Sequence, residues 1–210
     1  RLYRLLHEQN QVVLAQAAQL RQANQQLTEQ SERLYRASIT DGLTGVNNRA
    51  QGMQRLHELV HASAAGRRQA VILLDVDLFK SINDNYGHPV GDQVLVTVAR
   101  VLQQALPEGA ELSRVGGEEF MVLIPDADQR QLFDIGNALR AQVRAATVEV
   151  AGQRIGVTIS VGICAVADLP HVSAHQAYAA ADDALYRAKR GGRDCVCVHA
   201  RTEVDAQTEG

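Results

Sequence analysis

A pair of glycines at positions 116–117 constrains the fold more than any other feature of the sequence. A short strand-like stretch, residues 112–115, precedes the pair, and the apolar run 120–124 follows it. Two glycines between such runs are typical of the turn of a β-hairpin. The turn presents Glu118 and Glu119 next to each other at the end of the hairpin. Acidic pairs are common in turns simply because they are soluble, so this pair alone leaves its role open.

A second acidic cluster lies upstream and favours a functional role for the acidic pair over a merely soluble turn. Asp75, Val76 and Asp77 follow the almost continuous apolar run 70–74, which predicts a strand covered on both faces in the centre of a sheet. Hard oxygen ligands at two adjacent strand ends are what Mg²⁺ bound to a nucleotide phosphate requires. Asp77 could belong to this group of ligands or could be a structural acid at the strand end.

Four motifs together resemble one known family. They are Gly-Gly-Glu-Glu-Phe at 116–120, Asp-Val-Asp-Leu-Phe-Lys at 75–80, Asn-Asp-Asn-Tyr-Gly-His-Pro-Val-Gly-Asp at 83–92, and Asp-Gly-Leu-Thr-Gly-Val-Asn-Asn-Arg at 41–49. In order and spacing they are similar to the GGDEF family of diguanylate cyclases, over roughly residues 38–199. The resemblance implies an α+β fold, a palm-like, ferredoxin-related nucleotidyl cyclase domain.

The first 37 residues differ in composition, with neither glycine nor proline. A seven-residue repeat places Leu6, Val13, Leu20, Leu27 and Leu34 at position d. The same repeat puts asparagine at two a positions, which favours a parallel two-stranded coiled coil. The alternative is a single helix packed on its own domain, but the polar a positions would give it a poor core face. We expect residues 1–37 to form a parallel dimerisation helix, 38–200 the catalytic domain and 201–210 a disordered tail.

Periodicity and turn residues predict the remaining elements. Helices are expected over about 49–65, 79–86, 88–106, 129–145 and 173–189, the fourth with Asp126 as its N-cap. A second hairpin is expected to pair 148–150 with 155–165, and a last short strand to cover 196–199.

The resemblance assigns the metal site and the proton acceptor. Asp75, the backbone carbonyl of Val76 and Glu118 would hold Mg²⁺, two ions per active site, with Mn²⁺ as an alternative ion. Glu118 is also the expected proton acceptor among the catalytic residues. Glu119 would help to bind nucleotide or metal.

The nucleotide would lie over the next two helices. Phe79 and Lys80 open the first of them, where backbone amides and the lysine attract phosphate oxygens, although a solvated surface lysine is the alternative. The family uses the positions of Asn83 and Asp92 to select guanine. His88 would line the same pocket, and a structural histidine at a helix start is its alternative role.

Arg114, Lys189 and Arg193 complete the set of positive residues at the expected site. The resemblance makes Lys189 and Arg193 phosphate contacts, and Arg114 is counted with the catalytic residues. The stretch 190–193 is not a Walker A loop, because the required spacing and the Lys-Ser/Thr pair are missing.

The implied reaction joins two GTP molecules into cyclic di-GMP and releases two pyrophosphates. Each domain would hold one GTP, so a homodimer through residues 1–37 would complete the active site. Many relatives carry an inhibitory product site, Arg-x-x-Asp, where this chain has Pro107 and Ala110, so we expect that site to be absent. Leu78 stands where the family more often has Phe or His, and only a mild packing effect is expected.

Composition gives no support for two other classes of function, nucleic-acid binding and membrane insertion. The formal net charge of −3 and the scattered arginines give no sign of nucleic-acid binding. No run of 18 apolar residues and no signal peptide is visible, so a cytoplasmic chain is expected. Because the sequence starts at Arg1, an upstream sensor domain or membrane anchor in a longer protein is compatible with it. Two alternatives to the enzyme remain: a catalytically silent GGDEF domain that binds GTP as a regulatory module, and a dimerisation adaptor.

Overall fold

The structure, a computed structural model, describes residues 2–63, 68–126, 128–150, 153–168 and 172–199. It divides into two units, Arg1–Ile39 and Thr40–Gly210, which are described separately. The polar tail 201–210, for which disorder was expected, lies outside the described residues. Among the helices that the structure describes, none is both long and apolar enough to cross a membrane.

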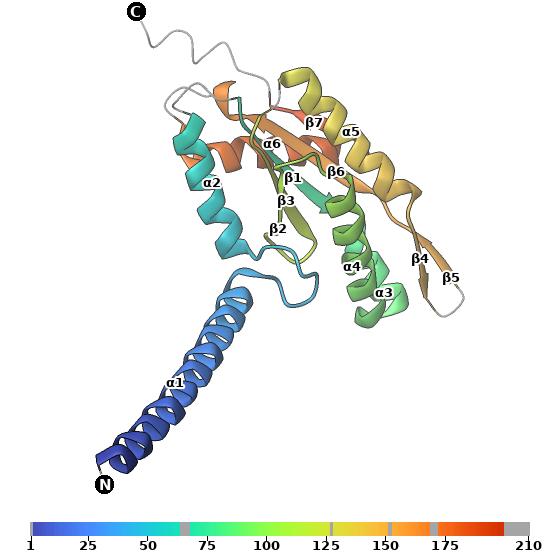
Figure 1. Cartoon of the computed structure of the whole chain (residues 1–210). Coiled ribbons are helices and arrows are strands. Elements are labelled where there is room, and N and C mark those ends of the chain that lie inside the picture. The colour runs from blue at the N-terminus through green and yellow to red at the C-terminus, as the bar shows by residue number, and fades with distance from the viewer. Residues whose placement is uncertain (1, 64–67, 127, 151–152, 169–171, 200–210) are drawn as a thin grey trace, which may run out of the picture. The chain divides into compact units, whose positions relative to one another are not determined.

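The first unit is a single helix, α1 (Leu2–Ile39), of 38 residues (Figure 1). Its interior lacks glycine and proline, so nothing interrupts the backbone hydrogen bonds. Three of the predicted d-position leucines, Leu20, Leu27 and Leu34, are 64%, 62% and 73% exposed in the single chain. Within the first unit, these three side chains therefore have no cover.

The second unit is built on a five-stranded sheet in the order β2-β3-β1-β6-β7. Its strands are β1 (Ala70–Val76), β2 (Glu111–Arg114), β3 (Glu119–Ile124), β6 (Ile159–Ala165) and β7 (Val196–Val198). Neighbouring strands are antiparallel except β6 and β7, which are parallel. The predicted α+β class and the predicted hairpin of β2 and β3 are confirmed.

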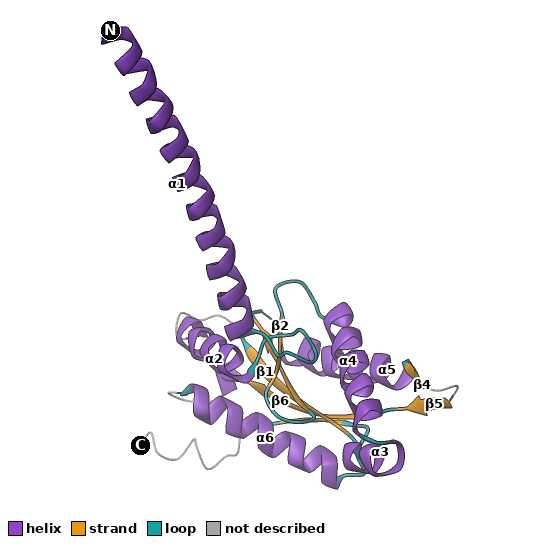
Figure 2. Ribbon diagram, turned by 90° about the horizontal axis from the view of Figure 1, so that it is seen from below, coloured by secondary structure: helices purple, strands orange, loops and turns teal. Residues whose placement is uncertain are grey.

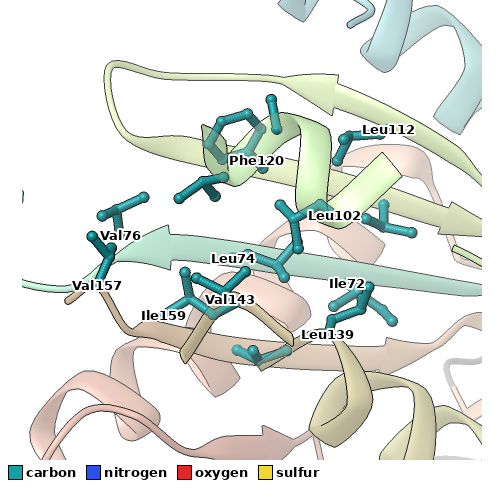
Figure 3. Packing of buried hydrophobic residues seen from close by; sticks show 14 of the residues in the cluster. Ile72, Leu74, Val76, Leu102, Leu112, Phe120, Leu139, Val143, Val157 and Ile159 are labelled. Atoms are coloured by element: carbon teal, nitrogen blue, oxygen red, sulfur yellow. The ribbon is translucent and has the colours of Figure 1, made fainter. Parts of the chain in front are cut away.

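Helices cover both faces of this sheet (Figure 2). One face carries α2 (Arg49–Ser63) and α6 (Ala174–Arg190), and the other carries α4 (His88–Ala105) and α5 (Gln129–Ala145), with α3 (Phe79–Tyr86) beside α4. Successive residues of β1 alternate between these two cores: Leu73 belongs to the cluster under α2 and α6, and Ile72 and Leu74 to the other, where they lie near Leu102 and Leu139 (Figure 3). Every residue of β1 is buried, as expected for a central strand.

Two expectations about element boundaries were wrong. The run 155–165 is not one strand: β4 (Thr147–Val150) and β5 (Gln153–Gly156) form a separate two-stranded sheet, and β6 begins at Ile159 because its buried residues pair with β1. The N-cap of α5 is Asp128 and not Asp126. Asp128 accepts a hydrogen bond from the backbone N–H of Gln131, whose side chain in turn accepts from the backbone N–H of Asp128.

Candidate functional site

The ends of β1 and β3 bring the predicted acidic residues to one edge of the sheet. Asp75 lies directly opposite Glu119 in the antiparallel register. One residue further along, the Val76 N–H donates to the backbone carbonyl of Glu118 at 3.2 Å. Asp75 continues the alternation of Val71 and Leu73, so it belongs to the sheet face covered by α2 and α6. The two acidic clusters are therefore neighbours, although 43 positions separate Asp75 from Glu118 along the chain.

Asp75 is a buried carboxylate with a cation beside it. The residue is only 5% exposed, and the Lys189 Nζ on α6 lies 2.6 Å from its Oδ2. Burial raises the pKa of Asp75 to about 6, because an apolar surrounding disfavours the charged form. Lys189 opposes this rise, and the nearby charges of Glu118 and Glu119 add to it. The site thus holds more negative charge than one lysine neutralises.

The hairpin turn is fastened to the loop that follows α1. Arg114 donates to the Gly117 carbonyl through Nη2 at 2.6 Å and to Asp41 Oδ1 through Nη1 at 3.0 Å. Burial alone would raise the pKa of Asp41, but hydrogen bonds from Thr44 and the Arg114 guanidinium outweigh it and lower that pKa. Arg49 adds a hydrogen bond to the Val115 carbonyl at 2.6 Å. The predicted catalytic Arg114 therefore contacts the turn itself.

The Glu119 side chain lies against Gly116 of the hairpin turn. A Cβ atom at position 116 would lie 2.3 Å from Glu119 Oε2, so any larger residue there would make this carboxylate move. Tyr178 on α6 lies on the same side: burial raises its pKa, and the charge of Glu119 raises it further. Glu119 is consequently half-buried, with the turn on one side and Tyr178 of α6 near enough for its charge to be felt.

The contacts of Asp77 favour its interpretation as a structural acid at the strand end. It is 6% exposed, and its carboxylate accepts hydrogen bonds from Ser160 Oγ at 2.6 Å, from Thr158 Oγ1 at 2.7 Å and from the backbone N–H of Asp194 at 3.0 Å. These three contacts join the end of β1 to the start of β6 and to the loop after α6.

The residues expected to bind the base gather on α3 and α4. The Asn83 Oδ1 atom is buried, and in the part of the chain that the structure describes it has no hydrogen-bond partner. Gly91 lies against it: a Cβ there would be 2.0 Å from Asn83 Oδ1. His88 and Asp92 are exposed and one helical turn apart on α4. An unpaired amide oxygen beside exposed polar side chains is suited to a hydrogen-bonding ligand.

The other two predicted residues of α3 differ in exposure. Phe79 is buried in the core, so its side chain packs against the protein and only its main chain is suited to ligand contact. Lys80 is exposed. The residue before them, Leu78, adopts a left-handed conformation with φ 56° and is 61% exposed, so it makes little packing contact.

The last predicted pair of positive residues lies where α6 ends. Lys189 contacts Asp75, as described above, and Arg193 is exposed in the following loop. The structure therefore brings Asp75, Glu118, Glu119 and Lys189 together. Asn83, His88 and Asp92 form a second group on α3 and α4.

The donors at the strand ends fit a hard divalent cation. Two carboxylates and a backbone carbonyl are ligands of the kind that Mg²⁺ prefers, and the excess negative charge around Asp75 favours a cation. Within the described residues, no group of three or more His, Cys, Asp or Glu side chains is already arranged around a common centre. The predicted set does not need one, because one of its three members is the Val76 carbonyl.

Residue-by-residue interpretation of the sequence missed several neighbours of the predicted site residues. Asp41 holds Arg114, and Asp194 joins the loop after α6 to Arg140 and Arg144 on α5. Asp41 lies inside one of the four motifs, which was a usable signal. Nothing in the sequence near Asp194 indicates its partners, because they lie 50 and 54 positions away.

Comparisons with known proteins point to one family. A family model described as "Diguanylate cyclase, GGDEF domain" matches residues 38–195. The chain is 38% identical over 158 residues to diguanylate cyclase DgcP of Pseudomonas aeruginosa, covering 75% of this chain and 23% of that protein. It spans 23% to 50% of the length of the first four curated relatives that it matches.

Solved structures show the same fold. The coiled coil and GGDEF domain of DgcB from Caulobacter crescentus, crystallised with c-di-GMP, superimposes with a TM-score of 0.82 at 29% identity, covering 89% of this chain and 98% of that one. Diguanylate cyclase SiaD from Pseudomonas aeruginosa, in complex with its activator SiaC, gives a TM-score of 0.75 at 34% identity and covers 94% of this chain and 75% of that one.

Proposed function

Since this chain belongs to the GGDEF family of diguanylate cyclase domains, we propose that it condenses two GTP molecules into cyclic di-GMP and releases two pyrophosphates. One observation carries the proposal. The paired ends of β1 and β3 put Asp75, Glu118 and Glu119 at one sheet edge, with Lys189 beside them.

Asp75, Glu118 and the Val76 carbonyl would hold the metal, Mg²⁺ or Mn²⁺, with two ions per active site. When bound, the metal supplies positive charge against the α-phosphate and lowers the pKa of the attacking hydroxyl. Glu118 lies just before β3 begins and would accept the proton of the 3′-hydroxyl. Lys189 neutralises Asp75 in the free protein, so a cation bound there would compete with it and leave its ammonium to the phosphates.

Positive groups from two elements would bind the triphosphate. Lys80 and the first amides of α3, beginning with that of Phe79, come from one side of the strand end, and Lys189 and Arg193 from the end of α6. Arg114 would contribute by holding the hairpin turn through Gly117, since its guanidinium is already bound there.

Guanine would be recognised by Asn83 and Asp92, with His88 lining the pocket. A carboxylate accepts from N1–H and N2–H₂, which guanine has in this arrangement and adenine lacks. Among the described residues, Asn83 Oδ1 has no hydrogen-bond partner, which is compatible with a role in ligand binding. Replacing the guanine with adenine would leave these polar groups unpaired, which is a strong basis for selectivity.

One domain holds one GTP, so the reaction would need two domains facing each other. We propose that residues 1–37 form the dimerisation helix, because the exposed Leu20, Leu27 and Leu34 require a partner and a parallel coil brings the next domains side by side. We further propose that the product does not inhibit through positions 107–110, where Pro107 and Ala110 replace the charged residues of the inhibitory motif.

The test is incubation with GTP and Mg²⁺, with pyrophosphate measured and the product identified. Glu118→Ala should lower turnover about a thousandfold by removing a metal ligand and the proton acceptor. Glu58→Ala, an acidic change on α2, is the matched control and should leave turnover unchanged. GTP binding without any pyrophosphate release would instead identify a silent GTP-binding module.

A further inference from the structure

The loop after α6 has a backbone conformation that most residues avoid. Gly192 has φ 117°, and it is followed by two non-glycine residues with positive φ, Arg193 at 65° and Asp194 at 45°. Side chains with a Cβ atom are unfavourable in this left-handed region, and such residues persist only where surrounding contacts hold them. Two successive residues in this conformation must therefore be held by contacts with the surrounding structure.

Asp194 supplies the restraint from its own side chain. Its Oδ1 accepts from Arg140 Nη1 at 2.8 Å, and its Oδ2 accepts from Arg144 Nη1 at 2.5 Å. Arg140 Nη1 also lies 3.3 Å from the Asp194 carbonyl. Arg140 and Asp194 are both about one-fifth exposed, so this ion pair is better shielded from water than an ordinary surface pair.

The main chain of the loop is fixed at two more points. The Asp194 N–H donates to the buried Asp77 carboxylate at 3.0 Å, and the Arg193 N–H donates to the Ala188 carbonyl at 3.1 Å. Asp77 lies two residues after Asp75 on the same strand end. Arg193 is thus held between the end of α6, which carries Lys189, and the strand end that carries the candidate metal ligands.

We infer that Asp194 is a positioning residue: gripped by Arg140 and Arg144, its carboxylate holds the backbone of Arg193 in the conformation from which the guanidinium binds the triphosphate. This role rests on the proposed function. It does not require Asp194 to touch the nucleotide. It predicts that replacing Asp194 weakens nucleotide binding only because Arg193 is no longer held in place.

The experiment measures the affinity of the dimeric protein for a non-hydrolysable GTP analogue with Mg²⁺ by titration calorimetry. Arg193→Ala and Asp194→Ala should each weaken binding about tenfold, and the double variant should be no weaker than Arg193→Ala alone, because coupled residues are not additive. KM for GTP should rise in both single variants with a smaller change in kcat. Glu58→Ala removes a carboxylate from another arginine, Arg55, which keeps Glu111 as a partner, and should have no effect.

A second variant distinguishes a loss of affinity from a loss of folding. Asp194→Asn tolerates the left-handed backbone but lacks the charge that binds two arginines, so it should keep the melting temperature within a few degrees and still lose affinity several-fold. The inference is overturned if Arg193→Ala weakens binding while Asp194→Asn and Asp194→Ala do not, or if the losses at 193 and 194 simply multiply. If the wild-type protein itself fails to bind the analogue, the proposed function is wrong, and the inference about Asp194, which rests on it, is wrong as well.

Discussion

Asp75 is held in a setting that opposes its charge. The strand end is buried, and two more carboxylates approach it from the hairpin turn. The salt bridge to Lys189 at 2.6 Å only partly compensates, and the pKa of Asp75 is raised to about 6. In the proposed function Asp75 binds a metal ion, so its cost to the stability of the free protein would be a common compromise between stability and function.

Asp75→Asn should therefore stabilise the metal-free protein at neutral pH. The folded-state pKa of about 6 exceeds the ordinary value of 3.8, so the folded protein holds this proton more tightly than the unfolded chain. Stability lost through Asp75 accordingly grows as the pH rises from 4 to 6 and is complete above pH 6. The variant should gain at most about 3 kcal/mol in free energy of unfolding at pH 7.5.

Urea unfolding in EDTA between pH 4 and pH 8 measures this difference. The gain should shrink towards zero at pH 4, where the wild-type carboxyl is also neutral. Asp84→Asn, on the exposed surface of α3, serves as the control. A variant less stable than wild type at pH 7.5 would show that the Lys189 salt bridge outweighs the cost of burial.

At this scale, residues next to a strand end could be predicted and their distant partners could not. Asp75 and Glu118 could be predicted to lie near each other because each follows or precedes an apolar run whose end is visible in the sequence. Asp77 and Asp194 are joined across 117 positions, and Asp41 and Arg114 across 73. Such pairs arise from the packing of the whole domain, which leaves no local pattern.

At the scale of elements, α6 lies unusually close to β6. A Cβ atom built on Gly162, in the middle of β6, would lie 2.2 Å from the Leu185 backbone N and 2.3 Å from the Ala181 carbonyl oxygen. The helix face that meets the strand is rich in alanine, including Ala181 and Ala184, which permits the close approach. Because α6 carries Lys189 at its end, this contact sets how far the lysine can reach towards Asp75.

Gly162→Ala should push α6 away from the sheet. Backbone atoms cannot move aside as a flexible side chain can, so the variant should lose roughly 3 kcal/mol of stability. Gly156→Ala, at the end of β5, meets no atom within 4 Å and should change stability by less than about 0.5 kcal/mol. Chemical denaturation of both variants gives the comparison, and equal stabilities would mean that α6 has room to shift.

Element types were predictable where periodicity was strong and element ends where the signal was local. The almost continuous apolar run of β1 and the glycine pair of the hairpin located β1, the two strands β2 and β3, and their turn. The run 155–165 was wrongly treated as one strand, because sequence cannot tell where a chain leaves one sheet and enters another. Asp126 and Asp128 are equally good N-caps in composition, and only the hydrogen bonds with Gln131 distinguish them.

At the scale of the whole molecule, the site described here lies within one domain, and the proposed reaction joins two substrates. Each 3′-hydroxyl must reach the α-phosphate of the other GTP, so activity should depend on how often two domains meet. Under the proposal, the helix α1 brings the two domains together, since its Leu20, Leu27 and Leu34 are exposed in the single chain. A similar combination, a coiled coil followed by a GGDEF domain, occurs in the solved structure of DgcB.

Disrupting the seam should convert turnover per chain from a constant into a function of protein concentration. Leu27→Lys places two lysines against each other at one d position and should raise the dimer dissociation constant by roughly a hundredfold. Gln26→Lys makes the same charge change at the neighbouring outward position and should leave the dimer intact. Deletion of residues 1–37 should act as Leu27→Lys does, only more strongly.

Analytical ultracentrifugation and pyrophosphate release, measured over the same dilution series, test this together. Turnover in Leu27→Lys should fall on dilution in parallel with the dimer fraction and recover at high protein concentration, because the catalytic residues in 38–200 are untouched. Affinity for a GTP analogue should stay unchanged, since each domain binds its nucleotide alone. Specific activity that remains constant on dilution in the deleted protein would mean that α1 has no part in bringing the two substrates together, and that the domains find each other through their own surfaces.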